Sequence, residues 1–363
     1  MKILILRVSA IGDVVHTLPC IFLLKRLYPK AKISWVVQEK ASTLLTQQQY
    51  LEHVWILRDG FLNVKNLPHT FKIIKDIRKT KWDAILDFQG ILKSSIILAS
   101  LKGKKFGFSS DHARLDLSSH LTKHHTNPIY TNIIQKNLTL ADNISLRNWA
   151  KENNFLNSQY LNSSPCLENL KDDFFLNYPQ NNKDFINDWL KNNKIPKFIT
   201  IAPNTTWPSK HWPAENWQEL LELLSRQENK VKIVLLGKYF GEPGKTLSKY
   251  CKDNNLNIFT APQMDLKTTA YLISKTELLV GPDTGLLHLA DFLDKKTIGI
   301  FGPTTAVKHG PFLKKENIKT SIQIPCSHPR QKIHGDGSKE QNCMYQLTPK
   351  GLFSKIMDLL SNS

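Results

Sequence analysis

Short apolar runs alternate with amphipathic segments along the first half of the chain. Four runs have the length and composition of buried parallel strands, at residues 2–8, 34–37, 54–57 and 84–87. Three other segments place apolar residues at helical spacing, at residues 14–27, 71–78 and 92–101. This alternation predicts right-handed βαβ units that build a doubly wound parallel sheet.

The composition changes between about residues 153 and 197, where Asn, Ser and Pro are frequent and one helix is expected at residues 183–192. The alternation then restarts, with strands expected at residues 198–202, 231–236, 277–280 and 297–301. Further helices are expected at residues 213–224, 245–253, 266–274 and 348–360. We therefore expect α/β domains over residues 1–165 and 196–345, a linker at 166–195 and a terminal helical segment at 346–363. A ligand is expected in the cleft that the two domains face.

Composition restricts the class of protein. A length of 363 residues suits two hydrophobic cores, and a hydrophobic share of 41% excludes a disordered chain. No apolar run approaches the ~18 residues of a membrane span, and Arg7 and Asp13 interrupt the first apolar stretch too early for a secretion signal. Five cysteines, an odd number, favour reduced thiols in a cytoplasmic protein over a disulfide framework.

The excess of positive charge is large, because 49 Lys and Arg stand against 31 Asp and Glu, which gives +18. Such an excess favours an acidic partner: nucleic acid, an anionic membrane surface or a phosphorylated small molecule. The sequence has no helix-turn-helix, zinc-finger or RNA-recognition signature, and its cations are spread along the whole chain. We therefore expect no nucleic acid as partner, and a nucleic-acid-binding protein is the distant alternative.

The first segment with candidate chemistry spans residues 7–16. The first apolar run ends there, and a turn containing Gly12 leads to Asp13 at a helix start. In open α/β sheets the carboxyl end of the first strand faces the ligand crevice. Asp13 is therefore either a helix N-cap or a general base. The segment lacks a G-x-G-x-x-G pattern, so a dinucleotide site is not supported.

The second segment spans residues 280–290, where an expected strand runs into Gly-Pro-Asp-Thr-Gly and an apolar helix. The backbone N–H groups of Thr284 and Gly285, after Asp283, would lie at the positive end of the helix dipole and bind a phosphate. His288, one turn into the helix, would reach the same anion. The alternative is an ordinary capped helix with a half-buried histidine.

The third segment spans residues 202–213 and follows the first strand of the second half. Thr205, Thr206 and Lys210 supply two hydroxyls and a mobile positive charge for phosphate oxygens. The alternative is a surface loop in which Trp212 is a packing anchor. A fourth segment, residues 236–243, contains Glu242, whose carboxylate would accept ribose hydroxyls. These loops together favour a nucleotide-type donor in the second half and an acceptor with its base in the first.

Metal chemistry has little support in the sequence. Cys326, His328, His334 and Cys343 suggest a zinc site, but their spacing matches no established ligand pattern, so free thiols are the preferred interpretation. No acidic D-x-D pair stands out as a divalent-ion site. We therefore expect no metal in the reaction.

Several of these segments match one family nearly end to end. The matching residues are 9–19 (Ser-Ala-Ile-Gly-Asp-Val-Val-His-Thr-Leu-Pro), 35–37 (Trp-Val-Val), 87–94 (Asp-Phe-Gln-Gly-Ile-Leu-Lys-Ser), 205–206 with 210–213 (Thr-Thr and Lys-His-Trp-Pro), 283–289 (Asp-Thr-Gly-Leu-Leu-His-Leu) and 302–304 (Gly-Pro-Thr). With these motifs the sequence resembles the ADP-heptose:lipopolysaccharide heptosyltransferases, glycosyltransferase family 9. It resembles the type I enzymes most, and a type II or III enzyme or another family 9 glycosyltransferase is the alternative.

The resemblance implies the GT-B architecture, with an acceptor-binding first domain, a nucleotide-sugar-binding second domain and a last helix that returns towards the first. It implies inverting, metal-independent transfer of L-glycero-D-manno-heptose from ADP-heptose to Kdo of the lipopolysaccharide inner core. No cofactor is implied besides the donor substrate. The implied location is the cytoplasmic face of the inner membrane of a Gram-negative bacterium, as a peripheral protein bound to its anionic surface, with Kdo-lipid A as acceptor.

Carried over by motif, Asp13 is the expected general base, and Thr205, Thr206 and Lys210 are the expected diphosphate ligands. The turn at Asp283, Thr284 and Gly285, with His288 nearby, is the expected sugar and phosphate site, and Glu242 is the expected ribose-binding acid.

The acceptor side departs from the family, in which a cluster of arginines follows the third strand. Here residues 57–65 contain one arginine, Arg58, beside Asp59. Arg114 matches a family arginine and is, with Lys65, the expected acceptor-binding cation. A run of cations crosses this region with only Asp76 opposing it: Lys65, Lys72, Lys75, Arg78, Lys79 and Lys81. The run forms either a face towards anionic lipid or an ordinary solvated helix face.

Overall fold

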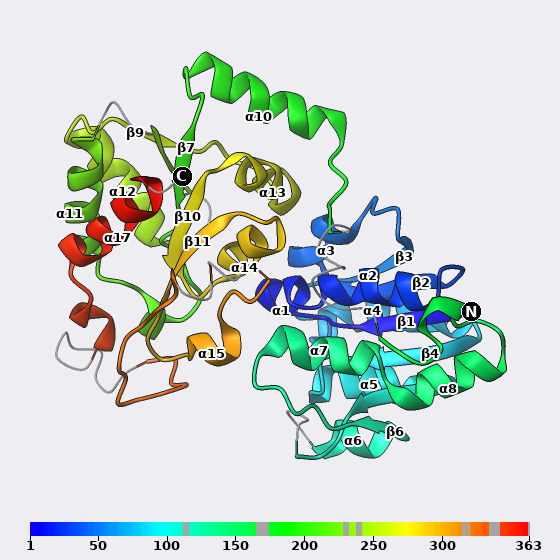
Figure 1. Ribbon diagram of the computed structural model, residues 1–363. Coiled ribbons are helices and arrows are strands. Elements are labelled where there is room, and N and C mark those ends of the chain that lie inside the picture. Colours follow the sequence, from blue (N-terminus) through cyan, green and yellow to red (C-terminus); the bar gives the residue numbers. More distant parts are fainter. Residues whose placement is uncertain are drawn as a thin grey trace. The chain divides into compact units, whose positions relative to one another are not determined.

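The computed structural model describes residues 1–111, 116–164, 174–227, 232–236, 242–313, 317, 320–333 and 342–361; of residues 116–118 and 242 it describes the backbone only. The chain forms two compact units, Met1–Asn177 and Tyr178–Ser363 (Figure 1). Within the described part, no helix has both the length and the apolar character that crossing a membrane requires.

The first unit is built on a parallel sheet whose described strands follow the order β3-β2-β1-β4-β5-β6. The strands are β1 (Lys2–Leu6), β2 (Lys32–Gln38), β3 (Leu51–Leu57), β4 (Trp82–Asp87), β5 (Gly103–Phe108) and β6 (His124–Thr126). The helices are α1 (Ile11–Val15), α2 (Leu18–Leu27), α3 (Glu39–Leu45), α4 (Leu67–Arg78), α5 (Leu92–Ser100), α6 (Asp116–Leu121), α7 (Ile133–Ala141) and α8 (Ile144–Glu152), with 3-10 turns η1 (Val64–Asn66) and η2 (Ser158–Tyr160).

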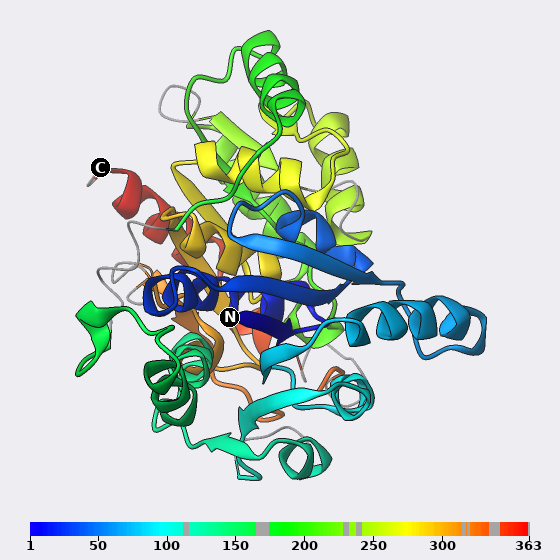
Figure 2. The ribbon, with the colours of Figure 1, turned by 90° about the vertical axis from the view of Figure 1, so that its right-hand side faces the viewer.

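Helices pack on both faces of this sheet, which is why β1 is apolar on both sides. Ile74 and Ile77 of α4 and Ile97 of α5 share one buried cluster with Leu4 and Leu6 of β1. The two helices lie on the same side of the sheet in Figure 2, and α2 packs against α7.

The second unit repeats the architecture, with the described strands in the order β12-β11-β10-β7-β8-β9. The strands are β7 (Phe198–Ile201), β8 (Lys232–Leu235), β9 (Ile258–Thr260), β10 (Leu278–Pro282), β11 (Lys296–Phe301) and β12 (Ile322–Gln323). The helices are α10 (Gln180–Asn192), α11 (Ala214–Ser225), α12 (Glu242–Asp253), α13 (Leu266–Lys275), α14 (Gly285–Phe292), α15 (Ala306–His309) and α17 (Pro349–Ser361), with 3-10 turns η4 (Pro208–Lys210) and η5 (Cys343–Gln346).

The last helix, α17, packs against α11 and contributes Leu352 and Ile356 to the core of the second unit. Its return towards the first unit stays a prediction. Helix α10, which we expected in a linker at residues 166–195, belongs to the second unit, where Asn182 Nδ2 donates to Thr268 Oγ1 of α13 over 2.5 Å. The part of that linker at residues 165–173 lies outside the described residues.

Both sheets have the strand order of a doubly wound dinucleotide-type fold, in which the strand order reverses beside the first strand. The reversal falls between β1 and β4 in the first unit and between β7 and β10 in the second. The predicted fold class, two doubly wound α/β sheets, is therefore confirmed. β7 and β10 come so close that a Cβ on Gly281 would lie 2.5 Å from the Ala202 carbonyl oxygen, so this strand position requires glycine.

One expected element was wrong. The helix predicted over residues 14–27 is two helices, α1 and α2, which are separated at His16 and Thr17. Pro19 has no N–H to donate back to residue 15, so a continuous helix would lose a hydrogen bond there, whereas the first turn of a new helix accepts proline. The separation leaves α1 as a short element at the end of β1.

Candidate active site

The first candidate site lies where the sheet order reverses in the first unit. Leu6 of β1 pairs with Asp87 of β4, so the loops that leave the two strands are neighbours at the carboxyl edge. One loop carries Arg7 and leads to Asp13, and the other carries Gln89. Ligands bind at such reversal points in open α/β sheets.

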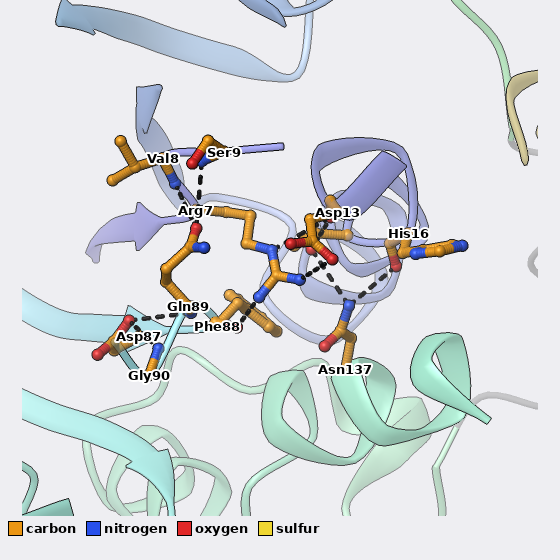
Figure 3. Close-up of polar contacts among 11 residues, drawn as sticks. Arg7, Val8, Ser9, Asp13, His16, Asp87, Phe88, Gln89, Gly90 and Asn137 are labelled. Carbon is orange, nitrogen blue, oxygen red and sulfur yellow. Dashed lines mark hydrogen bonds and ion pairs between the residues drawn. The ribbon is translucent and has the colours of Figure 1, made fainter. Parts of the chain in front are cut away.

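An ion pair between Arg7 and Asp13 forms the centre of this site (Figure 3). Arg7 Nη2 lies 2.7 Å from Asp13 Oδ1, and Nε donates to the Asp13 carbonyl oxygen over 3.3 Å. Nη1 donates to the Phe88 carbonyl oxygen, which ties the pair to the β4 loop. The arginine side chain is 1% exposed and the aspartate side chain 19%, so the carboxylate is the solvent-accessible end of the pair.

Side chains from the β4 loop fix the strand end that carries Arg7. Gln89 Oε1 accepts hydrogen bonds from the N–H groups of Val8 at 2.9 Å and Ser9 at 3.2 Å. Asp87, fully buried, accepts from the N–H groups of Gln89 and Gly90 at 3.0 and 3.2 Å. Gly90 has φ +61°, a conformation that glycine adopts without strain. Figure 3 shows these bonds as a frame beside Arg7.

Helix α1 is held from its other side by α7. Thr17 Oγ1 donates to the Asp13 carbonyl oxygen over 2.9 Å, and Asn137 Nδ2 donates to the His16 carbonyl oxygen over 3.1 Å and to Thr17 Oγ1 over 3.2 Å. Asn137 is fully buried. The backbone of α1 is therefore fixed by Arg7 in the loop after β1, by Thr17 at its own end and by Asn137 of α7.

The interpretation of Asp13 as an N-cap was wrong. The N-cap of α1 is Ala10, without a side-chain capping bond, and Asp13 lies in the first turn with its carboxylate on Arg7. A partly exposed carboxylate that a buried guanidinium orients is chemically suited to accept a proton from a bound hydroxyl. The sequence analysis predicted Asp13 but not Arg7. Arg7 could have been identified from its position, because it is a cation directly after a buried apolar strand.

The second candidate site lies at the reversal point of the second unit, where Asp283 follows β10. Its carboxylate accepts from Lys210 Nζ at 2.6 Å, His288 Nε2 at 2.9 Å and Thr304 Oγ1 at 2.7 Å. The Asp283 and His288 side chains are 8% and 4% exposed, so this is a buried cluster. The structure thus brings together three residues predicted from two separate segments, Lys210 from one and Asp283 with His288 from the other, and adds Thr304.

Asp283 is ionised in this cluster. Burial acts to raise the pKa of its carboxyl group, but the hydrogen bond from His288 and the positive charge of Lys210 outweigh burial and hold the pKa well below its usual range. Burial lowers the pKa of His309, at the end of α15, to about 4. The negative charge of Asp283 acts to raise this pKa, and Lys308 and His288 act to lower it. His309 is therefore neutral at pH 7.

The 202–213 loop contains the packing anchor that one interpretation expected, and phosphate binding by the loop stays a prediction. Trp212 is 1% exposed, donates to the Leu347 carbonyl oxygen over 3.0 Å and anchors the loop. Lys210 lies over the Trp207 ring, 4.8 Å from its centre, and turns its ammonium to Asp283. His211 Nε2 lies 2.9 Å from the Thr205 carbonyl oxygen, which orders the loop ahead of Lys210, and Thr206 is exposed.

The N-terminus of α14 lacks a side-chain capping bond. Thr284 is the N-cap and Gly285 the first helical residue, yet Thr284 makes no side-chain capping bond. Among the described residues Thr284 Oγ1 is buried and has no hydrogen-bond partner. A buried hydroxyl without a partner at the positive end of a helix is suited to an anionic ligand. His288 contacts Asp283 directly, so the half-buried histidine of the alternative is a buried member of the cluster.

Other predicted residues are less defined. Arg114 and His334 lie outside the described residues, as does the side chain of Glu242, whose backbone begins α12. Lys65 is exposed in η1. Neither Cys326 nor Cys343 is in a disulfide bond, and His328 Nδ1 lies 3.0 Å from Ser327 Oγ. Within the described residues, no three His, Cys, Asp or Glu side chains are placed to hold a metal ion.

Comparison with known proteins identifies a family that this chain matches. A sequence model described as glycosyltransferase family 9 (heptosyltransferase) matches residues 70–336. Lipopolysaccharide heptosyltransferase 1 of Campylobacter coli is 25% identical over 315 residues, 85% of this chain and 86% of that protein. The protein of the same name from Escherichia coli K12 is 24% identical over 343 residues, 92% and 95% of the two chains. The structure of E. coli heptosyltransferase WaaC with ADP superposes with a TM-score of 0.73 at 22% identity, covering 99% of this chain and 100% of that one.

Proposed function

Because the chain belongs to glycosyltransferase family 9, we propose that it transfers L-glycero-D-manno-heptose from ADP-heptose to a Kdo hydroxyl of the lipopolysaccharide inner core. The observation that carries this proposal is the partly exposed Asp13 carboxylate, which a buried Arg7 orients at the reversal point of the first sheet. Relatives named lipopolysaccharide heptosyltransferase 1, aligned over most of the chain, support the transfer of a heptose to lipopolysaccharide.

The acceptor step requires one base. The acceptor oxygen attacks the anomeric carbon of the heptose while the bond to the ADP oxygen breaks, and the hydroxyl proton passes to the Asp13 carboxylate. A single displacement inverts the anomeric carbon, so no second carboxylate is needed as a nucleophile. Arg7 orients the carboxylate, because its Nη2 lies 2.7 Å from Asp13 Oδ1 and a charge-assisted contact of this kind fixes the position of the oxygen.

The donor step requires stabilisation of the leaving diphosphate. In the second unit, Lys210 supplies a positive charge, and Thr205 and Thr206 supply hydroxyls. The N-terminus of α14 supplies the N–H groups of Thr284 and Gly285 together with the Thr284 hydroxyl. Asp283 holds Lys210 and His288 in place for this ligand. These groups neutralise the charge on ADP as it leaves, and we propose that the transfer needs no metal ion.

Fewer residues are assigned to the acceptor than to the donor. We assign Lys65 and Arg114 to the acidic acceptor, and Glu242 to the ribose of the donor. The acceptor is linked to lipid, so we place the enzyme at the cytoplasmic face of the inner membrane as a peripheral protein.

Incubation with ADP-heptose and Kdo-bearing lipid A, followed by mass spectrometry of the lipid, tests the proposal. The expected product has gained one heptose, and lipid A without Kdo gains none. A heptose added only to an acceptor that already carries one would instead assign a type II or III step. EDTA is expected to leave the rate unchanged, and inhibition that a divalent ion reverses would contradict the metal-free mechanism. Salt-sensitive binding to random duplex DNA without any heptose transfer would favour the nucleic-acid alternative.

A further inference from the structure

Helices α4 and α5 of the first unit expose large apolar side chains among cations. Phe71 of α4 is 64% exposed, and Leu92 and Ile96 of α5 are 53% and 42% exposed. The two helices pack beside one another on the same side of the sheet (Figure 2). We call this region the α4–α5 surface, which consists of Phe71, Lys72, Lys75, Arg78, Leu92, Lys93 and Ile96.

Each helix presents these residues as an outer stripe. In α4 the buried positions are Thr70, Ile74 and Ile77, so Phe71, Lys75 and Arg78 at spacings of four and three lie together on the opposite, exposed side. In α5 the buried Ser94, Ser95, Ile97 and Leu98 leave Leu92, Lys93 and Ile96 exposed. Aromatic and aliphatic groups at such spacing among lysines are typical of helices that lie on a membrane interface.

The charge of this surface has one sign. Lys72, Lys75, Arg78 and Lys93 are exposed, and Asp76 is the acidic residue of the two helices. Asp76 Oδ1 accepts from Lys79 Nζ at 2.6 Å, so a lysine outside the surface neutralises it. The four remaining cations are therefore available to anionic groups.

Within the part of the chain that the structure describes, helices α12 and α8 each lack this combination. α12 exposes Lys245, Lys249 and Lys252, but its described side chains include no large exposed apolar group. α8 exposes Ile144 at its start without a flanking stripe of cations. Helix α12 therefore has the character of an ordinary solvated basic helix. The exposed apolar residues distinguish the α4–α5 surface from such a helix.

The apolar residues lie near the edge of the sheet that carries Asp13. In a parallel α/β sheet each helix begins near the carboxyl edge of the strand before it. Leu92 is the first residue of α5 and follows the loop of Asp87 and Gln89 that frames Arg7, while Ile96 and Phe71 are fifth in their helices. A planar surface that contacts these residues therefore also lies beside the proposed acceptor end of the first unit.

We propose that the α4–α5 surface binds the face of an anionic lipid bilayer, with Phe71, Leu92 and Ile96 entering the headgroup region and the four cations contacting lipid phosphates. The use of this contact, to present Asp13 to a lipid-linked acceptor, rests on the proposed function; the binding itself does not. Membrane affinity of this kind adds an apolar and an electrostatic contribution, and each can be removed separately.

Co-sedimentation with phosphatidylcholine vesicles, with and without phosphatidylglycerol, tests the inference on the full chain. We expect binding only to vesicles that contain phosphatidylglycerol. Lys72→Gln with Lys75→Gln should weaken it about 30-fold at low salt, from the contribution of each lysine near an anionic surface. Phe71→Ser with Ile96→Ser should weaken it about tenfold through the lost apolar contact. The matched controls Lys249→Gln with Lys252→Gln on α12, and Ile144→Ser on α8, should bind as wild type.

Two readouts separate this inference from the proposed function. Heptose transfer to a soluble, deacylated Kdo acceptor should be equal in wild type and in the surface variants, because none of the substituted residues belongs to the active site. Wild-type binding to neutral vesicles alone, binding of both surface variants equal to wild type, or binding to duplex DNA in place of vesicles would overturn the inference. Surface-dependent vesicle binding without any heptose transfer would support it and refute the proposed function.

Discussion

Asp13 and Asp283 both lie at the reversal point of a doubly wound sheet, after different strands: Asp13 follows the first strand of its sheet and Asp283 the fourth strand of its sheet, and their surroundings differ. Each follows a strand at the reversal point, Asp13 after β1 and Asp283 after β10. The Asp13 side chain is 19% exposed and pairs with one buried arginine, whereas the Asp283 side chain is 8% exposed and accepts from Lys210, His288 and Thr304. Similar topology thus supports two different electrostatic sites.

The difference indicates separate tasks. A carboxylate that accepts three strong hydrogen bonds and whose pKa is held low is a poor proton acceptor, and it acts by positioning its partners. A carboxylate oriented from behind by one guanidinium and open to solvent on its other side can receive a proton. We therefore assign proton transfer to Asp13 and the positioning of Lys210 to Asp283.

Removal of Arg7 should give the largest change in stability. Arg7→Ala deletes a 1% exposed cation, leaving Asp13 without its ion pair and the Phe88 carbonyl without a donor. We expect the free energy of unfolding to fall by about 4 kcal/mol, as is usual when one partner of a buried pair is removed. Denaturant unfolding measures this, with Lys79→Ala, which breaks an exposed pair with Asp76, as the control. A loss no larger than that of the control would contradict the buried pair.

His309 should make stability depend on pH near the second site. Its pKa is about 4 in the folded chain and ~6.5 when unfolded, so between these values the unfolded chain binds a proton that the folded chain does not. The contribution of His309 to the free energy of unfolding is therefore fully present above about pH 6.5. It is lost as the pH falls through this range, by about 2 kcal/mol from pH 7 to pH 5.

In His309→Gln this part of the pH dependence should disappear, whereas His120→Gln, at an exposed position, should retain it. Unfolding by urea at the two pH values gives the comparison. An unchanged pH dependence in His309→Gln would show that this histidine is not the group responsible.

Lys210 should control donor affinity with little effect on the fold. Lys210→Met removes the charge proposed to contact the diphosphate while keeping the stem over the Trp207 ring. ADP affinity should fall about tenfold, the usual contribution of one charge-assisted hydrogen bond. Lys332→Met is the matched control, because Lys332 is exposed and lies 6.0 Å from the same ring. Calorimetric titration with ADP that shows equal affinities for the two variants would exclude Lys210 as a phosphate ligand.

Thr284 should give the smallest effect. Its buried hydroxyl has no partner among the described residues, so Thr284→Val is expected to leave stability unchanged and to weaken ADP binding about fivefold. Thr276→Val is the opposite case, because its hydroxyl donates to the Phe198 and Leu278 carbonyl oxygens, and should cost about 1 kcal/mol of stability without changing ADP affinity. A Thr284→Val variant that loses stability but binds ADP normally would contradict the assignment.

The sequence predicted candidate site residues where these residues follow a strand directly along the chain. Asp13, Lys210, Asp283 and His288 could be predicted because each belongs to a segment that follows the end of an apolar strand, and strand ends converge in a doubly wound sheet. That convergence also explains why Lys210 and Asp283, 73 residues apart, form an ion pair.

Contacts that depend on tertiary structure could not be predicted in the same way. Arg7 has a local signal, an isolated cation after a buried strand, but its bond to Phe88 spans 81 residues. Asn137 comes from a helix 120 residues after Thr17 and carries no motif. The break between α1 and α2 was detectable at Pro19, yet the apolar spacing across it favoured a single helix.

The most direct test of the two assignments measures single-turnover heptose transfer and ADP affinity in parallel, in Asp13→Asn and Asp283→Asn. For Asp13→Asn we predict a transfer rate at least about 100-fold below wild type with ADP affinity unchanged, because only the proton acceptor is lost. For Asp283→Asn we predict ADP binding weakened about tenfold, with most of the rate retained at saturating donor. Substantial transfer by Asp13→Asn, or equal loss of ADP binding in both variants, would contradict the account.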